Sequence, residues 1–206
     1  NKGALVWVKS RNDSHDHHIV DTVRGANELL YTNSTAAQAN TANRITAFTN
    51  DGYTIGSAGQ VNGTSAYTYG GWNFRKKAGF CDIVTWTGDS NTNQTISHSL
   101  GCVPGMIITK CTSDADDWWI YHRGVDSESP QNYTVDFGSG SRTESANFWG
   151  DTAPTSTEFT AGSAINTNSR TYVSYLLAGG EDQGNASVEF NGKNNLTIHN
   201  DSTGSS

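Results

Sequence analysis

Short stretches in which apolar and polar residues alternate follow one another along the chain, separated by turns rich in glycine and asparagine. An alternation with a period of two puts every second side chain on one face, as in a half-buried β-strand. Residues 79–88 and 94–98 have this pattern on either side of a turn, and so do residues 187–192 and 195–198. The pattern predicts an all-β protein.

The chain also contains an internal repeat. Each copy has an apolar first strand, an aromatic second strand, a polar middle, a glycine-containing strand and an aromatic last strand. The aligned segments are 3–9 with 105–110, 17–25 with 118–124, 47–58 with 153–164, and 66–72 with 171–177. A repeat of about one hundred residues has the length of a small domain and is far longer than a solenoid unit.

The repeat predicts two β-sandwich-like modules of the jelly-roll type with a short C-terminal β extension. The first module comprises residues 1–78, and the second comprises residues 79–179 with a hairpin at its start. Residues 180–206 form the extension, which is the start of a further β domain or a linker. Because a single small sandwich buries only a limited core, we expect the two copies to gain stability by packing together.

The composition excludes several classes of protein. The chain has 206 residues, a formal net charge of -7, 6 Trp, 8 Tyr and 7 Phe, so it has aromatic core material that a disordered chain lacks. An acidic chain without a large basic cluster offers no electrostatic surface for nucleic acid. No apolar run reaches the roughly 18 residues that a membrane helix needs. We therefore expect neither nucleic-acid binding nor membrane insertion.

Asp13, His15 and His17 are the candidate metal ligands. Residues i and i+2 of a strand share a face, so histidine and carboxylate side chains in this spacing can converge on one ion. The second copy has tryptophans in place of the paired histidines, and the alternative interpretation is packing or loop polarity.

Asp114, Asp116 and Asp117 imitate the alternating carboxylates of a calcium loop. The glycine and the distal glutamate of such a loop are absent, and a solvated acidic turn is the alternative interpretation.

The densest aromatic cluster consists of Trp118, Trp119, Tyr121, His122 and Arg123. Adjacent tryptophans on a strand point to opposite faces, so one of the two is expected in the core. The other, if exposed beside histidine and arginine, would suit stacking on a sugar ring or anchoring a protein interface. The cluster is therefore a candidate ligand-binding site, with a core or subunit-interface role as the alternative.

No catalytic residue and no cofactor are expected. Ser97-His98-Ser99 has no recognisable nucleophile setting, and Glu144 and Glu158 are only generic carboxylates for glycoside cleavage. The glycine-rich segment 138–141 lacks the lysine and the helix of a phosphate-binding loop.

Several motifs, in order over residues 3–179, resemble a domain of uncharacterised function found in structural proteins of marine tailed bacteriophages, cyanophages included. They are G-A-L-V-W-V-K, H-H-I-V-D-T-V-R-G, F-T-N-D-G-Y-T-I-G-S, T-I-S-H-S-L-G-C-V-P-G-M-I-I-T-K, W-W-I-Y-H-R-G and A-G-S-A-I-N-T. The resemblance implies a virion component, typically a tail fibre or appendage with β-rich modules, and no established catalytic residue. Residues 186–198 resemble the first strands of laminin-G-like, concanavalin-type domains.

The expected function is that of a phage virion structural protein, in a tail fibre or a capsid or tail appendage, that contributes to adhesion to host-surface glycans. The expected partners are other virion proteins, further copies of the chain, for example in a homotrimer, and a host cell-surface glycan. The expected location is the extracellular phage particle. The alternatives are a glycan-degrading depolymerase module, a secreted bacterial carbohydrate-binding protein, and a purely architectural protein without a ligand.

Overall fold

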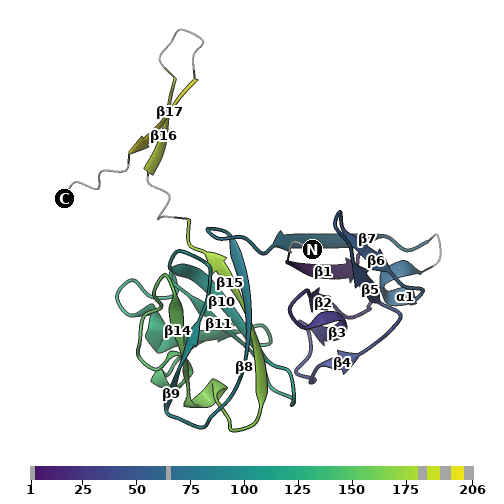
Figure 1. Cartoon of the computed structure of the whole chain (residues 1–206), viewed down its shortest axis with the longest axis horizontal. Helices are drawn as coiled ribbons and strands as arrows, with labels where there is room; N and C mark the ends of the chain where they lie inside the picture. Colours follow the sequence, from purple (N-terminus) through teal and green to yellow (C-terminus); the bar gives the residue numbers. More distant parts are fainter. Residues whose placement is uncertain (1–2, 64–65, 181–184, 191–195, 202–206) are drawn as a thin grey trace.

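The computed structural model describes residues 3–63 and 66–180, together with the backbone of residues 185–190 and 196–201 (Figure 1). Most elements in these ranges are β-strands, which confirms the all-β prediction. The α-helices among the described residues, α1 (Gly59–Asn62) and α2 (Ala146–Trp149), have 4 residues each. No helix in this part of the chain has the length and apolar character that crossing a membrane requires.

The first large sheet has the antiparallel strand order β4-β3-β2-β1-β7. Strands β1 to β4 form a meander, and β7 returns to pair with β1 along its whole length. This pairing leaves β7 at the edge of the sheet. The strands are β1 (Ala4–Ser10), β2 (His18–Asp21), β3 (Gly25–Tyr31), β4 (Ala39–Asn40) and β7 (Tyr69–Arg75).

The second large sheet has the order β13-β12-β11-β10-β15-β8. Strands β10 to β13 form a meander and β15 returns beside β10, which is the course that the chain follows in the first sheet. The strand β8 adds an edge beyond β15 that has no counterpart in the first sheet. The strands are β8 (Cys81–Thr87), β10 (Pro104–Cys111), β11 (Trp118–His122), β12 (Tyr133–Asp136), β13 (Arg142–Glu144) and β15 (Thr171–Ala178).

A small layer covers the outer face of each large sheet. The hairpin β5 (Ile45–Phe48) and β6 (Tyr53–Ile55) lies on the first sheet with α1. The pair β9 (Asn93–Ser97) and β14 (Glu158–Gly162) lies on the second sheet with α2. Two single-turn 3-10 helices, Pro130–Asn132 and Ser163–Ile165, connect elements of the second half.

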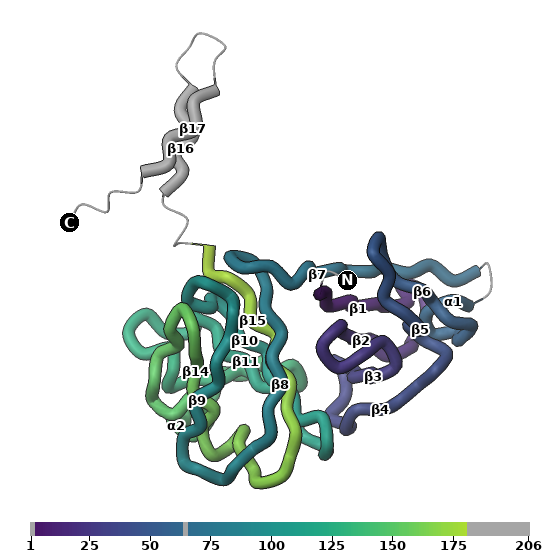
Figure 2. Tube along the Cα trace, in the orientation of Figure 1, coloured from purple at the N-terminus to yellow at the C-terminus, as the bar shows by residue number. Residues whose placement is uncertain are grey.

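The inner faces of the two large sheets pack against each other, so that four layers follow one another across the molecule (Figure 2). The two main sheets of this sandwich therefore come from different halves of the chain. Alternation along the strands sends one set of side chains into this middle core and the other set into an outer core. The buried residues of the middle core are Leu5, Ile19, Leu30, Cys81, Ile83, Trp118, Val173 and Tyr175.

The chain passes from the first sheet to the second between Arg75 and Cys81, where the repeat predicts the boundary between modules. Near the C-terminus, β16 (Asn185–Phe190) and β17 (Leu196–Asp201) pair as an antiparallel hairpin. The predicted C-terminal extension, residues 180–206, therefore contains two strands, while its residues 181–184, 191–195 and 202–206 lie outside the described residues.

A buried polar triad joins the two sheets. The Arg24 guanidinium donates a hydrogen bond to Asp21 Oδ2 at 2.6 Å and another to the Tyr175 hydroxyl at 2.9 Å. The Tyr175 hydroxyl in turn donates to Asp21 Oδ2 at 2.9 Å. Burial raises the pKa of Tyr175 well above its ordinary value, so the hydroxyl stays protonated and remains a donor. Asp21 lies on β2 and Arg24 lies in the β2–β3 turn of the first sheet, whereas Tyr175 lies on β15 of the second sheet. The triad therefore fixes the position of β15 relative to the first sheet.

Further hydrogen bonds cross the interface between the two halves of the chain. The Trp118 indole N–H donates to the carbonyl of Tyr31 at 2.9 Å, across from the second sheet to the first. The backbone N–H of Gln38 donates to the carbonyl of Thr112 at 2.9 Å. The interface therefore combines apolar burial with bonds that set a single relative position of the sheets.

Substituting Tyr175→Phe should remove both hydroxyl contacts and lower the free energy of unfolding by about 2–3 kcal/mol, because the lost bonds involve buried charged groups. The matched control is Tyr172→Phe on the same strand, whose hydroxyl accepts one neutral hydrogen bond from the backbone of Thr167 at 3.0 Å. That change should cost about 1 kcal/mol. Urea unfolding measures both values, and equal losses would contradict the role of the triad.

Candidate functional site

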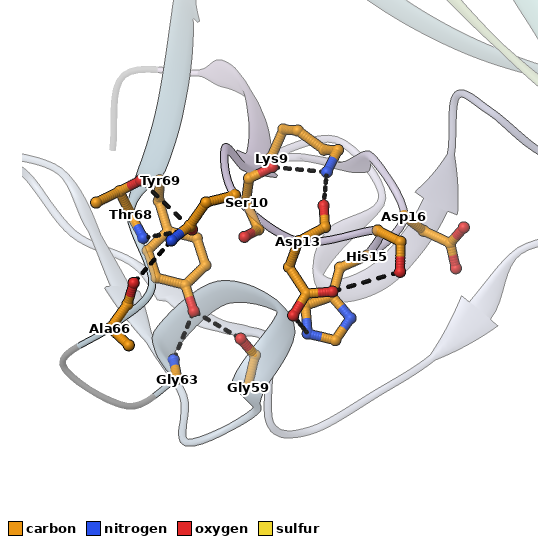
Figure 3. Close-up of polar contacts among 12 residues, drawn as sticks. Lys9, Ser10, Asp13, His15, Asp16, Gly59, Gly63, Ala66, Thr68 and Tyr69 are labelled. Carbon is orange, nitrogen blue, oxygen red and sulfur yellow. Dashed lines mark hydrogen bonds and ion pairs between the residues drawn. The ribbon is translucent and has the colours of Figure 1, made fainter.

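The loop between β1 and β2 holds two of the predicted metal ligands side by side. His15 Nε2 lies 3.7 Å from Asp13 Oδ2 (Figure 3). A hydrogen bond from the Tyr67 hydroxyl lowers the pKa of Asp13. Among the described residues no group of three or more His, Cys, Asp or Glu side chains is placed to hold a metal ion. The third predicted ligand, His17, lines a different site, so the geometry favours the loop-polarity interpretation.

Hydrogen bonds hold this loop against the segment that leads into β7 (Figure 3). The Asn12 side chain donates to the carbonyl of Ala66 at 2.7 Å and accepts from the N–H of Thr68 at 3.0 Å. The Tyr69 hydroxyl donates to the carbonyl of Gly59 at 2.6 Å, which anchors the start of β7 on α1. The loop between β1 and β2 is thereby fixed beside the β1–β7 pair.

The predicted calcium loop forms ion pairs instead. Arg170 Nη2 lies 2.7 Å from Asp114 Oδ2, and Arg170 Nη1 lies 3.9 Å from Asp116 Oδ2. A guanidinium in this position occupies the carboxylates that a cation would need. The arrangement favours the acidic-turn interpretation.

The predicted aromatic cluster on β11 lies largely in the core. Trp118 and Tyr121 are both 3% exposed, and they belong to the middle and the outer core respectively. Trp119 is half-buried with its ring centroid 4.4 Å from that of Phe148, and its indole N–H donates to Asp116. The two tryptophans point to opposite faces, as the strand geometry predicts. The buried rings of Trp118 and Tyr121 offer no free face to a sugar, so the core alternative fits these two residues.

The two polar members of that cluster also have local contacts. The exposed His122 accepts a hydrogen bond at Nδ1 from the backbone N–H of Gly124 at 3.1 Å. The Arg123 guanidinium packs against the backbone of Gly179, where a Cβ would lie 2.2 Å from one of its nitrogens.

A different set of aromatic residues forms an open groove at the edge of the first sheet. Trp7, Lys9, His17, Trp72 and Phe74 line this groove, which has a volume of about 390 Å³ and is called the aromatic groove below. Trp72 lies on the edge strand β7 and is 54% exposed, the largest exposure of any large apolar side chain among the described residues. An exposed tryptophan of this size indicates a binding surface.

The pairing of β1 with β7 explains how the groove forms. Trp7 and Trp72 are directly opposite each other in the register, so their rings share one face of the sheet. Their ring centroids are 6.0 Å apart with an interplanar angle of 58°. Trp7 and Phe74 also pack against the middle core, so the groove lies where the inner face of the first sheet emerges from the sandwich.

An apolar cavity of about 260 Å³ adjoins the groove and shares Trp7 and Phe74 with it. Residues of both large sheets line this cavity, and Phe137 lines it as well. The ring centroid of Phe137 lies 6.3 Å from that of Trp7 and 5.8 Å from that of Trp118. Phe137 is 39% exposed. The aromatic surface therefore continues from the first half of the chain to the second.

The ionisable side chains that line the groove are basic. Lys9 Nζ donates to the carbonyls of Ser10 at 2.6 Å and Asp13 at 2.8 Å, and it pairs with no carboxylate among the described residues. Burial lowers the pKa of His17, and the charge of Lys9 lowers it further, so the imidazole is neutral near pH 7. The indole N–H of Trp7 has no partner within the described part of the chain. Lys9 and His17 can donate to acceptors of a ligand, and Lys9 above all to an anionic group.

The sequence prediction identified His17 for a different role and missed Trp7, Lys9, Trp72 and Phe74. The tryptophans come from the first and the last strand of the first half, so only the β1–β7 register brings them together. The glycine two residues before Trp72 is the one local signal, because Gly70 lies on the same face of the strand and leaves room for the ring.

A family model described as a domain of unknown function, DUF7483, matches residues 2–195. The match therefore runs across both large sheets and into the C-terminal hairpin. No curated protein and no solved structure matches the chain.

Proposed function

The chain belongs to the DUF7483 family, a domain of unknown function, and we propose that it is a non-catalytic adhesion module of a phage virion appendage. In this proposal the aromatic groove binds sugar rings of a host-surface polysaccharide. The main support is Trp72, which lies on the edge strand β7 and is 54% exposed. It stands directly opposite Trp7 of β1. Rigid aromatic rings provide a large contact area at a small cost in conformational entropy.

The charge of the groove favours an acidic sugar. Lys9 and His17 line it, and no carboxylate is among its lining residues. One N–H of Lys9 remains after its two bonds to backbone carbonyls, and it can donate to a sugar carboxylate. The faces of the rings suit the apolar face of the sugar, while the basic groups suit its acidic substituent.

The assignment to a virion rests on the resemblance of the motifs over residues 3–179 to structural proteins of tailed phages. We include other virion proteins and further copies of this chain among the proposed partners, with a homotrimer as the proposed assembly.

We also propose that the two halves are copies of one β-sandwich-like module of the jelly-roll type. Support comes from the shared strand order and from two equivalent glycines. A Cβ on Gly56 would lie 2.4 Å from the carbonyl oxygen of Asn43, and a Cβ on Gly162 would lie 2.4 Å from that of Asn147. Such close backbone approaches at aligned positions are expected of duplicated modules.

The depolymerase alternative has less support. The residues lining the aromatic groove include no carboxylate that could act as an acid or a nucleophile. Glu144 and Glu158, the generic carboxylates, belong to strands of two different sheets, β13 and β14.

Substituting Trp72→Ala should weaken binding of an oligosaccharide of hexuronic acid about 30-fold, since removing an exposed tryptophan anchor costs about 2 kcal/mol. Isothermal titration calorimetry measures the affinity, with a neutral glucan oligosaccharide of the same length for comparison. The control Ile55→Ala removes an apolar side chain that is 41% exposed outside the groove, and it should bind like the unmodified protein. Equal affinities for all three proteins, or no binding by any of them, would refute the groove as a glycan site.

The affinity for the acidic oligosaccharide should rise as the pH falls from 7 through the lowered pKa of His17, because protonation adds a positive charge beside the ligand. The neutral oligosaccharide should show no such change. A His17→Gln variant should keep the binding at pH 7 and lose the increase at lower pH. An increase that persists in this variant would assign the pH dependence to another group.

Immunogold labelling of intact phage particles with an antibody against this chain tests the virion assignment. Label on fibres or other appendages is expected, since the proposed function places the module on the particle surface. Particles that contain the chain by mass spectrometry but carry no surface label would contradict the adhesion role, and particles without the chain would contradict the virion assignment.

A further inference from the structure

A second concave site lies at the opposite edge of the first sheet from the aromatic groove. It has a volume of about 490 Å³, within the range of about 300–1,000 Å³ that is typical of small-molecule sites. Both halves of the chain line it, and we call it the polar cleft. The first half contributes Arg24, Glu28 and Gln38, and the second half contributes Thr85, Trp86, Thr87, Thr112, Thr171 and Tyr172.

The wall from the first half is held rigid by hydrogen bonds. Arg24 is neutralised by Asp21 and donates to Gln38 Oε1 at 2.7 Å, and the Gln38 amide donates to Glu28 Oε2. Asn40 donates to Glu28 Oε1 at 2.7 Å. Each oxygen of Glu28 accepts one hydrogen bond and keeps a further lone pair. Glu28 is therefore a fixed acceptor at the cleft.

The wall from the second half consists mainly of hydroxyl groups. Thr85 and Thr87 are exposed residues i and i+2 of the edge strand β8, so both side chains lie on one face. Neither hydroxyl has a partner among the described residues, and Thr171 pairs with the neighbouring Thr112 at 2.6 Å. This wall offers groups that both donate and accept.

Trp86, between the two threonines on β8, points to the opposite face of the strand and packs into the outer core of the second sheet. Its ring stacks on that of Tyr172 with centroids 5.3 Å apart and an interplanar angle of 13°. This stacking holds the strand that carries Thr85 and Thr87 on the second sheet.

We propose that the polar cleft binds a neutral polyol, such as an uncharged monosaccharide. Hydroxyl groups of such a ligand can donate to Glu28 and exchange hydrogen bonds with Thr85 and Thr87. An anion would face the Glu28 carboxylate, while the charge of Arg24 is already compensated. The inference goes beyond the proposed function, because it involves none of the residues of the aromatic groove.

Occupation of the cleft would also stabilise the packing of the two sheets. The ligand would contact residues on both sides of the interface, and a ligand that binds only the folded arrangement raises its stability by mass action. Neutral monosaccharides should therefore raise the melting temperature of the protein in a saturable manner.

The test is a titration of the ¹⁵N-labelled full chain with glucose, galactose and N-acetylglucosamine, followed through the backbone N–H signals of Glu28, Thr85 and Thr87. A saturable shift of these three signals by at least one neutral sugar is expected. Glucuronate and glucosamine serve as the anionic and cationic probes, and a response to one of these alone would overturn the neutral-polyol assignment.

The double variant Thr85→Val and Thr87→Val should lose at least 10-fold in affinity for that sugar, because it removes two hydroxyl groups and keeps the shape of the side chains. The matched control is Thr143→Val, an exposed threonine on β13 at the other edge of the same sheet, which should bind normally. The Trp72→Ala variant should keep the response of the Glu28, Thr85 and Thr87 signals, so failure of the groove and failure of the cleft are distinguishable. No saturable response to any neutral sugar, or full affinity in the folded double variant, would overturn the proposal.

Discussion

The packing of the first large sheet on the second depends on one buried ion pair in the first half of the chain, to which a tyrosine of the second sheet adds hydrogen bonds. Arg24 and Asp21 are removed from water by the second sheet, and this removal is tolerable only because the charges pair and the Tyr175 hydroxyl satisfies both of them. Apolar burial alone tolerates small sliding movements of two sheets, whereas a three-membered hydrogen-bonded contact has a single geometry. The rigid relative position of the sheets then determines what forms at the two edges of the first sheet. The aromatic groove lies at the β7 edge, and the polar cleft lies beside β3 and β4 with Arg24 in its wall.

Much of the fold could be predicted from the sequence, because alternation and turn residues are local properties. The relation between the two halves required the structure, since it depends on which face each residue occupies. Aligning Gly3 with Gly105 pairs Val6 with Ile108, yet Val6 lies in the first outer core and Ile108 packs on the middle core. The strand registers agree when Val6 is matched with Ile107 instead, because the Val6–Val20 pair then corresponds to the Ile107–Tyr121 pair. A shift of one residue reverses every face of a strand, and motif similarity does not detect it.

The location of the candidate site could not be predicted for the same reason, because the exposure of a side chain depends on how distant strands pair. The adjacent tryptophans Trp118 and Trp119 led to a predicted ligand-binding site because they are neighbours in the sequence. Their strand is central in its sheet and lies between two layers, so both of its faces are covered. Trp72 has only a preceding glycine to mark it in the sequence, and it is exposed because its strand is at the edge of the sheet. Whether a strand is central or at an edge depends on pairing between distant segments. The type of chemistry, aromatic rings beside basic groups, could be anticipated from the composition, and its location could not.

The net charge of -7 raises the question of how an acidic chain would hold an acidic polysaccharide. At physiological ionic strength the Debye length is about 8 Å, so charges elsewhere on the surface act weakly on a ligand in the groove. The charged Lys9 would be in direct contact with the ligand, where screening is least effective. The overall charge therefore slows the approach of an acidic polymer slightly and has little effect on the bound state. In the polar cleft, the compensated Arg24 and the single Glu28 carboxylate leave no positive charge for such a polymer. The two sites would consequently select ligands of different charge on the same rigid pair of sheets.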